Sequence, residues 1–152
     1  MLVPVSAHAV RALLLRPSAA DDAIAPPPVL AMLADLAERI EAGFTPAAWQ
    51  VIEAGQPVGL FSLTRAPEAG ALDIGYGIAP AWQGRGLARQ ALAELVQWAL
   101  HDPRVQRLTA ETAVTNLASQ AVLRGNGFVV TGQRIDADDG PLLCWQLLLV
   151  VP

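Results

Sequence analysis

Residues 72–112 change in pattern three times, from LDIGYGI (72–78) through the glycine-containing PAWQGRG (80–86) and a helical segment (86–101) to VQRLTAET (105–112). The first and last segments have the composition of β-strands. The middle segment predicts a helix ended by Pro103, because small and apolar residues recur in it at four-residue steps: Leu87, Ala91, Leu95 and Ala99. A strand, a loop, a helix and a second strand in this order form a βαβ unit with parallel strands and a right-handed crossover.

The segments on both sides of this unit predict further strands and helices. Towards the N-terminus we expect a strand (10–16), a loop to Pro28, one helix (29–42) as the only helix of this part, and a hairpin (47–53 and 57–64). Towards the C-terminus we expect a short helix (116–124) and two strands (128–135 and 142–149). The fold class is therefore α/β (α+β). We expect one domain over residues 1–152, with a mixed, mostly antiparallel sheet of about seven strands, a central parallel pair and helices on both faces.

Composition limits the classes of function. The chain has 152 residues, 53% of them hydrophobic, a mean hydropathy of +0.39 and a formal charge of −4. All 10 basic residues are arginine, and the acidic balance argues against a broad nucleic-acid-binding face. Cys144 is the single cysteine, and no Cys/His cluster has metal-ligand spacing, so no metal is expected. The apolar runs are too short to span a bilayer, so we expect a soluble, cytoplasmic protein with no membrane partner.

The loop between the first strand and the helix of the βαβ unit predicts an anion site. It reads Gln83-Gly84-Arg85-Gly86-Leu87-Ala88. A helix N-terminus presents unpaired amides and a partial positive charge, and glycines allow a phosphate to approach the backbone. A P-loop is excluded because the chain has no lysine, and a dinucleotide fingerprint because Arg89 stands where a small residue is needed. A tight turn without a ligand is the alternative.

The order of several motifs resembles the GNAT superfamily of N-acetyltransferases. The motifs are Gln83-x-x-Gly86-x-Ala88 after a strand and Asn116-x-x-Ser119 ahead of Asn126-Gly127-Phe128. The resemblance is close over residues 71–129 and looser before them. Within the superfamily, residues 74–80 and the Asn116 motif look most like the branch that acetylates N-terminal amines of ribosomal proteins. Many small-amine acetyltransferases are similar there, so the acceptor stays open.

The resemblance implies acetyl-coenzyme A as co-substrate. Backbone amides of residues 84–89 would hold its pyrophosphate, and its pantetheine arm would run between the fourth and fifth strands, which part after Ile78. The residues implied in cofactor binding are Ile78, Gln83, Gly84, Arg85, Gly86, Leu87, Ala88, Arg89, Asn116 and Ser119. Strand alternation adds that Gly75, Gly77 and Ala79 share one small face, which would admit close approach of the arm or of a helix.

Acetyl transfer to an amine needs a neutral amine, a stabilised oxyanion and a proton for the departing thiolate. In the GNAT pattern a glutamate five residues before the asparagine serves as base, and Glu111 stands there. The family's acid is a tyrosine seven residues after the asparagine, where this chain has Leu123, so the resemblance implies Ser119 as acid. Ser119 could equally cap its helix. Tyr76 is a second candidate for the catalytic hydroxyl, and the alternative for it is a packing role in the core. Asp73 is a second candidate for the base.

From the sequence we expect an acetyl-coenzyme A-dependent N-acetyltransferase acting by direct attack in a ternary complex. The acceptor would be a protein N-terminus or a small-molecule amine, with a homodimer as one option and no nucleic acid as partner. The alternative is a non-catalytic acyl-coenzyme A sensor.

Overall fold

A computed structural model, which describes residues 1–16 and 22–149, contains one seven-stranded sheet in the order β1-β2-β3-β4-β5-β7-β6. The first half of the chain contains β1 (Leu2–Val5), α1 (Ala7–Ala12), η1 (Leu13–Leu15), α2 (Pro27–Glu41), β2 (Ala48–Glu53) and β3 (Gln56–Leu63). The second half contains β4 (Ala71–Ile78), η3 (Pro80–Trp82), α3 (Leu87–Leu100), β5 (Arg107–Ala113), α4 (Leu117–Gly125), β6 (Val129–Asp136) and β7 (Gly140–Leu148). This confirms the predicted α/β fold with its mixed sheet.

The sheet has one parallel pair at its centre. Ala71–Ile74 of β4 pair in parallel with residues 107–110 of β5, and every other neighbouring pair of strands is antiparallel. The parallel pairing ends at Ile74 and Ala110. The prediction that the two strands part after Ile78 is therefore wrong by four residues. The reason is that β4 follows β3 as far as Ile78, while β5 follows β7, so the two strands diverge earlier.

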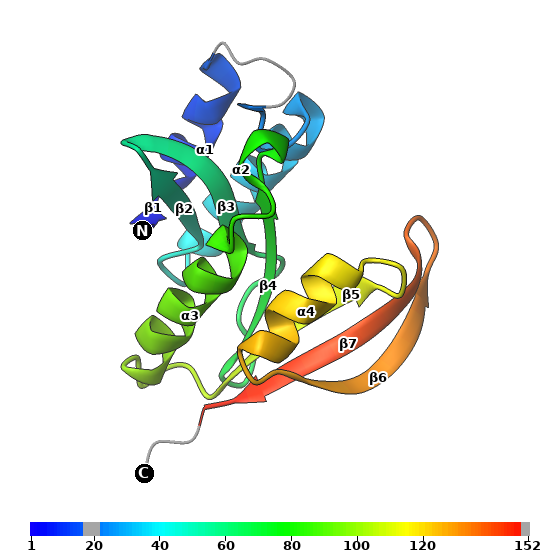
Figure 1. The fold of residues 1–152 in the computed structure, drawn as a ribbon. Helices are drawn as coiled ribbons and strands as arrows, with labels where there is room; N and C mark the ends of the chain where they lie inside the picture. Colours follow the sequence, from blue (N-terminus) through cyan, green and yellow to red (C-terminus); the bar gives the residue numbers. More distant parts are fainter. Residues whose placement is uncertain (17–21, 150–152) are drawn as a thin grey trace.

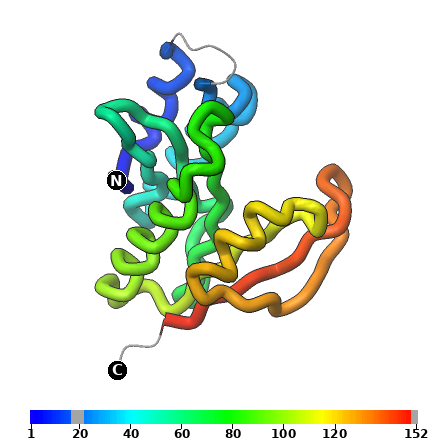
Figure 2. Tube along the Cα trace, viewed as in Figure 1, coloured from blue at the N-terminus to red at the C-terminus, as the bar shows by residue number. Residues whose placement is uncertain are grey.

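The helices cover both faces of the sheet. Val10 of α1 and Leu30 of α2 pack with Leu60 of β3, whereas Trp98 of α3 packs on Trp49 of β2, whose side chain points to the opposite face from its neighbour Ala48. Figures 1 and 2 show α1 and α2 gathered at the N-terminal half of the sheet, away from the β6–β7 hairpin. Helices α3 and α4 lie together on the other face. The face of β5 and β7 opposite α4 thus carries no helix within the described chain.

The N-terminal segment differs from its prediction. Residues 10–16 were expected to form a strand, but α1 and η1 occupy most of them, and the first strand is β1. Ser6 starts the helix, because its hydroxyl accepts a hydrogen bond from the backbone N–H of Ala9. Ala7 and Val10 are then buried on one helical face. The helix expected over 29–42, which is α2, is therefore not the only helix before the βαβ unit. Part of the loop expected before Pro28 lies outside the described residues.

The remaining elements confirm the prediction to within a few residues. A close approach of β3 to β4 needs Gly59, since a Cβ there would lie 2.5 Å from Cδ1 of Ile78 and 2.9 Å from the Gly77 carbonyl oxygen. The end of β4 is thereby set against the core, where Ile78 is 9% exposed.

None of the helices in the described residues is long and apolar enough to cross a membrane.

Candidate active site

A cavity of about 370 Å³ lies where β4, the N-terminus of α3 and α4 meet. Nine of the residues expected in cofactor binding line it: Ile78, Gln83, Gly84, Gly86, Leu87, Ala88, Arg89, Asn116 and Ser119. Tyr76 lines it as well. Four lining residues were not predicted as site residues: Gly77, Trp82, Ala118 and Val122. Ala118 and Val122 are four residues apart on α4, so helical periodicity beside Ser119 could have indicated them.

The loop before α3 has the backbone of an anion site. Gly84 and Gly86 have φ values of 75° and 76°, which favour glycine, and a Cβ at either would meet nothing within 4 Å. Gly86 is the N-cap of α3, no side chain caps it, and the first turn holds no acidic residue. The amides of this turn therefore face open space with a partial positive charge.

Two arginines extend this positive charge. The guanidinium of Arg85 lies 4.7 Å from the Trp82 ring centroid and donates to the Ala81 carbonyl at 3.1 Å. Arg89 lies against Gly125, where a Cβ would come within 2.9 Å of its Nε. Within residues 1–16 and 22–149 neither arginine forms an ion pair. Of the predicted cofactor residues, Arg85 is the one that does not line the cavity.

Two amide side chains brace the walls of the cavity. Gln83 Nε2 donates to the Ile78 carbonyl at 2.9 Å, which ties the loop to the end of β4. Asn116 is the N-cap of α4, and its Oδ1 accepts from the Ser119 amide at 3.1 Å. The helix-capping reading of Asn116 is thereby confirmed, and a contact of the same residue with a ligand stays a prediction.

Tyr76 and Ser119 form a hydroxyl pair in the cavity wall. Their hydroxyl oxygens lie 2.7 Å apart, and the Tyr76 ring stacks on Phe61 with centroids 4.8 Å apart. Burial raises the pKa of the Tyr76 hydroxyl above its ordinary value, and the hydrogen bond with Ser119 opposes this only in part. Both residues line the cavity, so the pair can pass a proton toward it. Leu123, at the position of the family tyrosine, is fully buried in the core.

Side chains on the small face of β4 would point away from the cavity, although Gly77 itself lines it. A Cβ at Gly75 would contact Thr64, and one at Gly77 would contact the Ile24 carbonyl. Tyr76 and Ile78 of the large face line the cavity together with Gly77, which lies between them. A close approach of the pantetheine arm to the backbone of Gly77 stays a prediction.

Glu111 lies on the face of the sheet opposite the hydroxyl pair. It directly follows Ala110, the last β5 residue that pairs with β4. Arg134 Nη2 donates to its Oε1 at 2.9 Å, Arg134 Nε donates to its Oε2, and the Cys144 Sγ lies 3.7 Å from Oε2. These hydrogen bonds from Arg134 hold the pKa of Glu111 below its ordinary value. Arg134 and Cys144 were not predicted as neighbours of this carboxylate.

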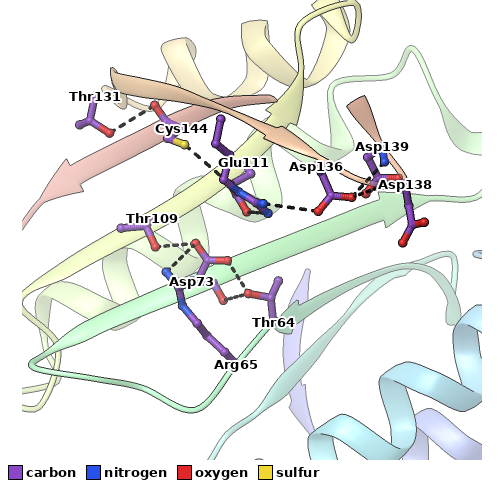
Figure 3. Close-up of polar contacts among 11 residues, drawn as sticks. Thr64, Arg65, Asp73, Thr109, Glu111, Thr131, Asp136, Asp138, Asp139 and Cys144 are labelled. Atoms are coloured by element: carbon purple, nitrogen blue, oxygen red, sulfur yellow. Dashed lines mark hydrogen bonds and ion pairs between the residues drawn. The ribbon is translucent and has the colours of Figure 1, made fainter. Parts of the chain in front are cut away.

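Asp73 is engaged on the same face as Glu111. Figure 3 shows it between Thr64 and Thr109, each of which donates its hydroxyl to one of the two carboxylate oxygens. Its side chain is 8% exposed, and Arg65 lies 3.8 Å away. A hydrogen bond to each carboxylate oxygen and burial of the side chain make Asp73 a structural link between β4 and β5. Among the described residues no group of three or more His, Cys, Asp and Glu could hold a metal ion.

A family model described as an acetyltransferase (GNAT) domain matches residues 2–129. The chain therefore belongs to the GNAT acetyltransferase family. A search of curated proteins finds no match.

Solved structures with the same fold include members of several branches. RimL, a ribosomal-protein α-N-acetyltransferase in complex with coenzyme A, is 20% identical with a TM-score of 0.75, covering 97% of this chain and 93% of that one. AAC(6')-Ib in complex with ribostamycin and coenzyme A is 17% identical with a TM-score of 0.69, covering 97% and 92%. The ribosomal-protein-S5-alanine acetyltransferase from Vibrio fischeri is 16% identical with a TM-score of 0.70, covering 97% and 92%. At these identities the likeness shows the fold alone.

Proposed function

We propose that this protein is an N-acetyltransferase that moves an acetyl group from acetyl-coenzyme A to a primary amine. The observation that carries the proposal is the cavity between the end of β4, the N-terminus of α3 and α4, which joins an uncapped helix N-terminus to the Tyr76–Ser119 hydroxyl pair. Family membership and the coenzyme A complexes of RimL and AAC(6')-Ib support the same co-substrate.

The residues present fit acetyl-coenzyme A. The amides of residues 84–89 would hold its pyrophosphate, and Arg89, which is in no ion pair within the described chain, would add charge complementarity. Asn116 and Ile78 would line the path of the pantetheine arm. When bound, acetyl-coenzyme A supplies an activated thioester carbonyl.

Deprotonation of the amine and protonation of the thiolate would then involve residues on opposite faces of the sheet. Glu111 would accept the proton of the acceptor ammonium, directly or through water, so that the neutral amine nitrogen attacks the carbonyl carbon. The backbone amide near Ile78 would stabilise the oxyanion. As the carbon–sulfur bond breaks, Ser119 would give its proton to the thiolate and take one from Tyr76. The proton that the new amide nitrogen loses would pass through solvent to restore the Tyr76 hydroxyl.

The acceptor is a primary amine of a protein N-terminus or of a small molecule. RimL is described as acting on a ribosomal protein, and AAC(6')-Ib is seen with an aminoglycoside, so the fold serves both classes. A cytoplasmic location and a homodimer stay predictions.

Calorimetric titration with acetyl-coenzyme A tests the proposal before an acceptor is known. We compare the wild type with Gly86→Asp and with Gly86→Ala as a matched control. Both variants place a Cβ at a positive φ, at a cost of about 1 kcal/mol, and neither Cβ meets an atom within 4 Å. The aspartate alone places a carboxylate on the amides of the first turn, so we expect at least tenfold weaker binding than with Gly86→Ala.

Equal affinities of the two variants would contradict the site. If the wild type binds, release of free thiol is followed with a panel of amines and peptides. Glu111→Gln should lower turnover with little change in acetyl-coenzyme A affinity. Binding without transfer to any acceptor would favour the non-catalytic sensor.

A further inference from the structure

The face of the sheet that carries Glu111 has a charged side-chain cluster that the proposed reaction uses only in part. Figure 3 shows Asp73, Thr109, Glu111, Cys144 and Asp136 on neighbouring strands. Since no helix of residues 1–16 and 22–149 covers β5 and β7 on this face, an acceptor can reach the cluster from solvent. The side chain of Arg134 extends from the edge strand β6 past β7 to Glu111 on β5.

A β-bulge directs Arg134 toward Glu111. The register of β6 on β7 runs Val129 to Gln146 and Val130 to Trp145, then resumes with Gly132 opposite Cys144, so Thr131 is an extra residue. In a regular pairing Thr131 would stand opposite Cys144, so Arg134 would lie opposite Pro141 and point to the face that carries α4. With the bulge, Arg134 stands opposite Leu142 and shares the face of Cys144 and Glu111.

Arg134 and Glu111 form a bidentate ion pair, which leaves one hydrogen-bonding position free on the Glu111 carboxylate. Oε2 of Glu111 accepts from Arg134 Nε and from the Cys144 thiol, while Oε1 accepts from Arg134 Nη2. A carboxylate oxygen has two lone pairs, so Oε1 keeps one for a water molecule or an amine. The fork geometry of arginine fixes the plane of the carboxylate, which a lysine ammonium could not do.

The charged and titratable groups around Glu111 come from three strands and one turn. They are Arg134 and Asp136 on β6, Cys144 on β7, Asp73 on β4, and Arg65 on the turn between β3 and β4. Arg134 dominates, and the charge of Arg65 acts in the same direction at longer range. Asp136 binds Arg134 Nη1 at 3.4 Å, away from Glu111.

We propose that Arg134 is a positioning residue for acetyl transfer: it holds the Glu111 carboxylate ionised at the parting of β4 and β5, with Oε1 as the oxygen that takes the acceptor's proton. This rests on the proposed function. It adds a residue on the edge strand, two strands from Glu111 in the sheet, to the machinery of the reaction. The acceptor ammonium would then meet a carboxylate of fixed orientation, which lowers the entropy that has to be lost in reaching the reactive geometry.

The pH profile of kcat/KM for acetyl transfer tests the inference in a way that a merely structural role would not satisfy. We compare the wild type with Arg134→Gln, Arg134→Lys and, as a matched control, Arg65→Gln. Loss of Arg134 raises the pKa of Glu111, so the acid limb of the profile should move to higher pH in Arg134→Gln. The value of kcat/KM on the plateau should fall about tenfold, because the bidentate hydrogen bonds that orient the Glu111 carboxylate are lost.

The other two variants separate charge from orientation. Arg134→Lys keeps the positive charge but not the bidentate hydrogen bonds. The acid limb of its kcat/KM profile should therefore lie closer to that of the wild type, while kcat/KM on the plateau stays low. Arg65→Gln should shift the limb less than Arg134→Gln, because Arg65 is the weaker and more distant charge. If the acid limb and the plateau of the kcat/KM profile are the same in Arg134→Gln as in the wild type, the inference is overturned.

A direct titration separates failure of this inference from failure of the proposed function. Carbon-13 NMR of the glutamate carboxyls, assigned with Glu111→Gln, reports the protonation of Glu111 without any substrate. The carboxyl should titrate at higher pH in Arg134→Gln than in the wild type, and identical titrations would overturn the inference whatever the activity. If no amine is acetylated by the wild type at any pH, the proposed function fails, and with it the role of Arg134 in transfer.

Discussion

Replacement of Tyr76 by phenylalanine should separate the stability of the hydroxyl pair from its part in proton transfer. The ring can keep its stacking on Phe61, at 4.8 Å between centroids and 18° between planes, because only the hydroxyl is removed. The variant loses the 2.7 Å hydrogen bond to Ser119, which contributes about 1 kcal/mol to the free energy of unfolding. A urea titration should therefore show a folded protein with a modestly lower midpoint.

Turnover should respond more strongly than stability. Proton delivery by a positioned group contributes about 10²–10⁴-fold, so Ser119→Ala should lower kcat about hundredfold. Tyr76→Phe should lower it about tenfold, since Ser119 remains as the proposed donor to the thiolate. If the two hydroxyls act as one relay, the double variant should lose no more than Ser119→Ala alone. Release of free thiol at saturating acetyl-coenzyme A measures all four proteins. Losses that simply multiply in the double variant would refute the relay.

Two further predictions use residues outside the relay. Burial and the neighbouring charge of Glu111 raise the pKa of Cys144. Alkylation of Cys144 by iodoacetamide at neutral pH should therefore be slower than that of a free thiol, and faster in Glu111→Gln than in the wild type. An unchanged rate in the variant would contradict the contact between Glu111 and Cys144. Gly125→Ala places a Cβ where Arg89 lies, so acetyl-coenzyme A should bind several-fold more weakly by calorimetry although alanine suits a helix; unchanged affinity would remove Arg89 from the binding site.

The part of the fold that the sequence predicts well is the part whose signals are local. Gly86 before a run of periodic apolar residues fixes the start of α3, and Asn116 with Ser119 fixes that of α4. The cavity wall follows from these two helix starts and the end of β4. Residues 10–16 were mispredicted because the apolar run resembles a strand, whereas the cap at Ser6 and burial of one helical face favour a helix.

The surroundings of Glu111 could not be predicted from spacing. Arg134 lies 23 positions away along the chain, and it faces Glu111 only because Thr131 is an extra residue in β6. A register shift of one residue reverses every side chain beyond it, and no local sequence signal fixes its position. The same holds for Asp73, whose engagement depends on threonines from two other segments.

The early parting of β4 and β5 explains why the candidate site lies where it does. Beyond Ile74, β4 keeps its antiparallel partner β3 through Ile78, and beyond Ala110, β5 keeps β7 through Ala113. Each strand is thus held on its outer side, while the inner edges lack the pairing that joins them before the parting. Backbone groups along such edges need partners, and an extended arm with amide groups can supply them as an added strand would. Tyr76 and Glu111 flank this gap on opposite faces of the sheet, so an arm lying in it would bring its end between the hydroxyl pair and the carboxylate.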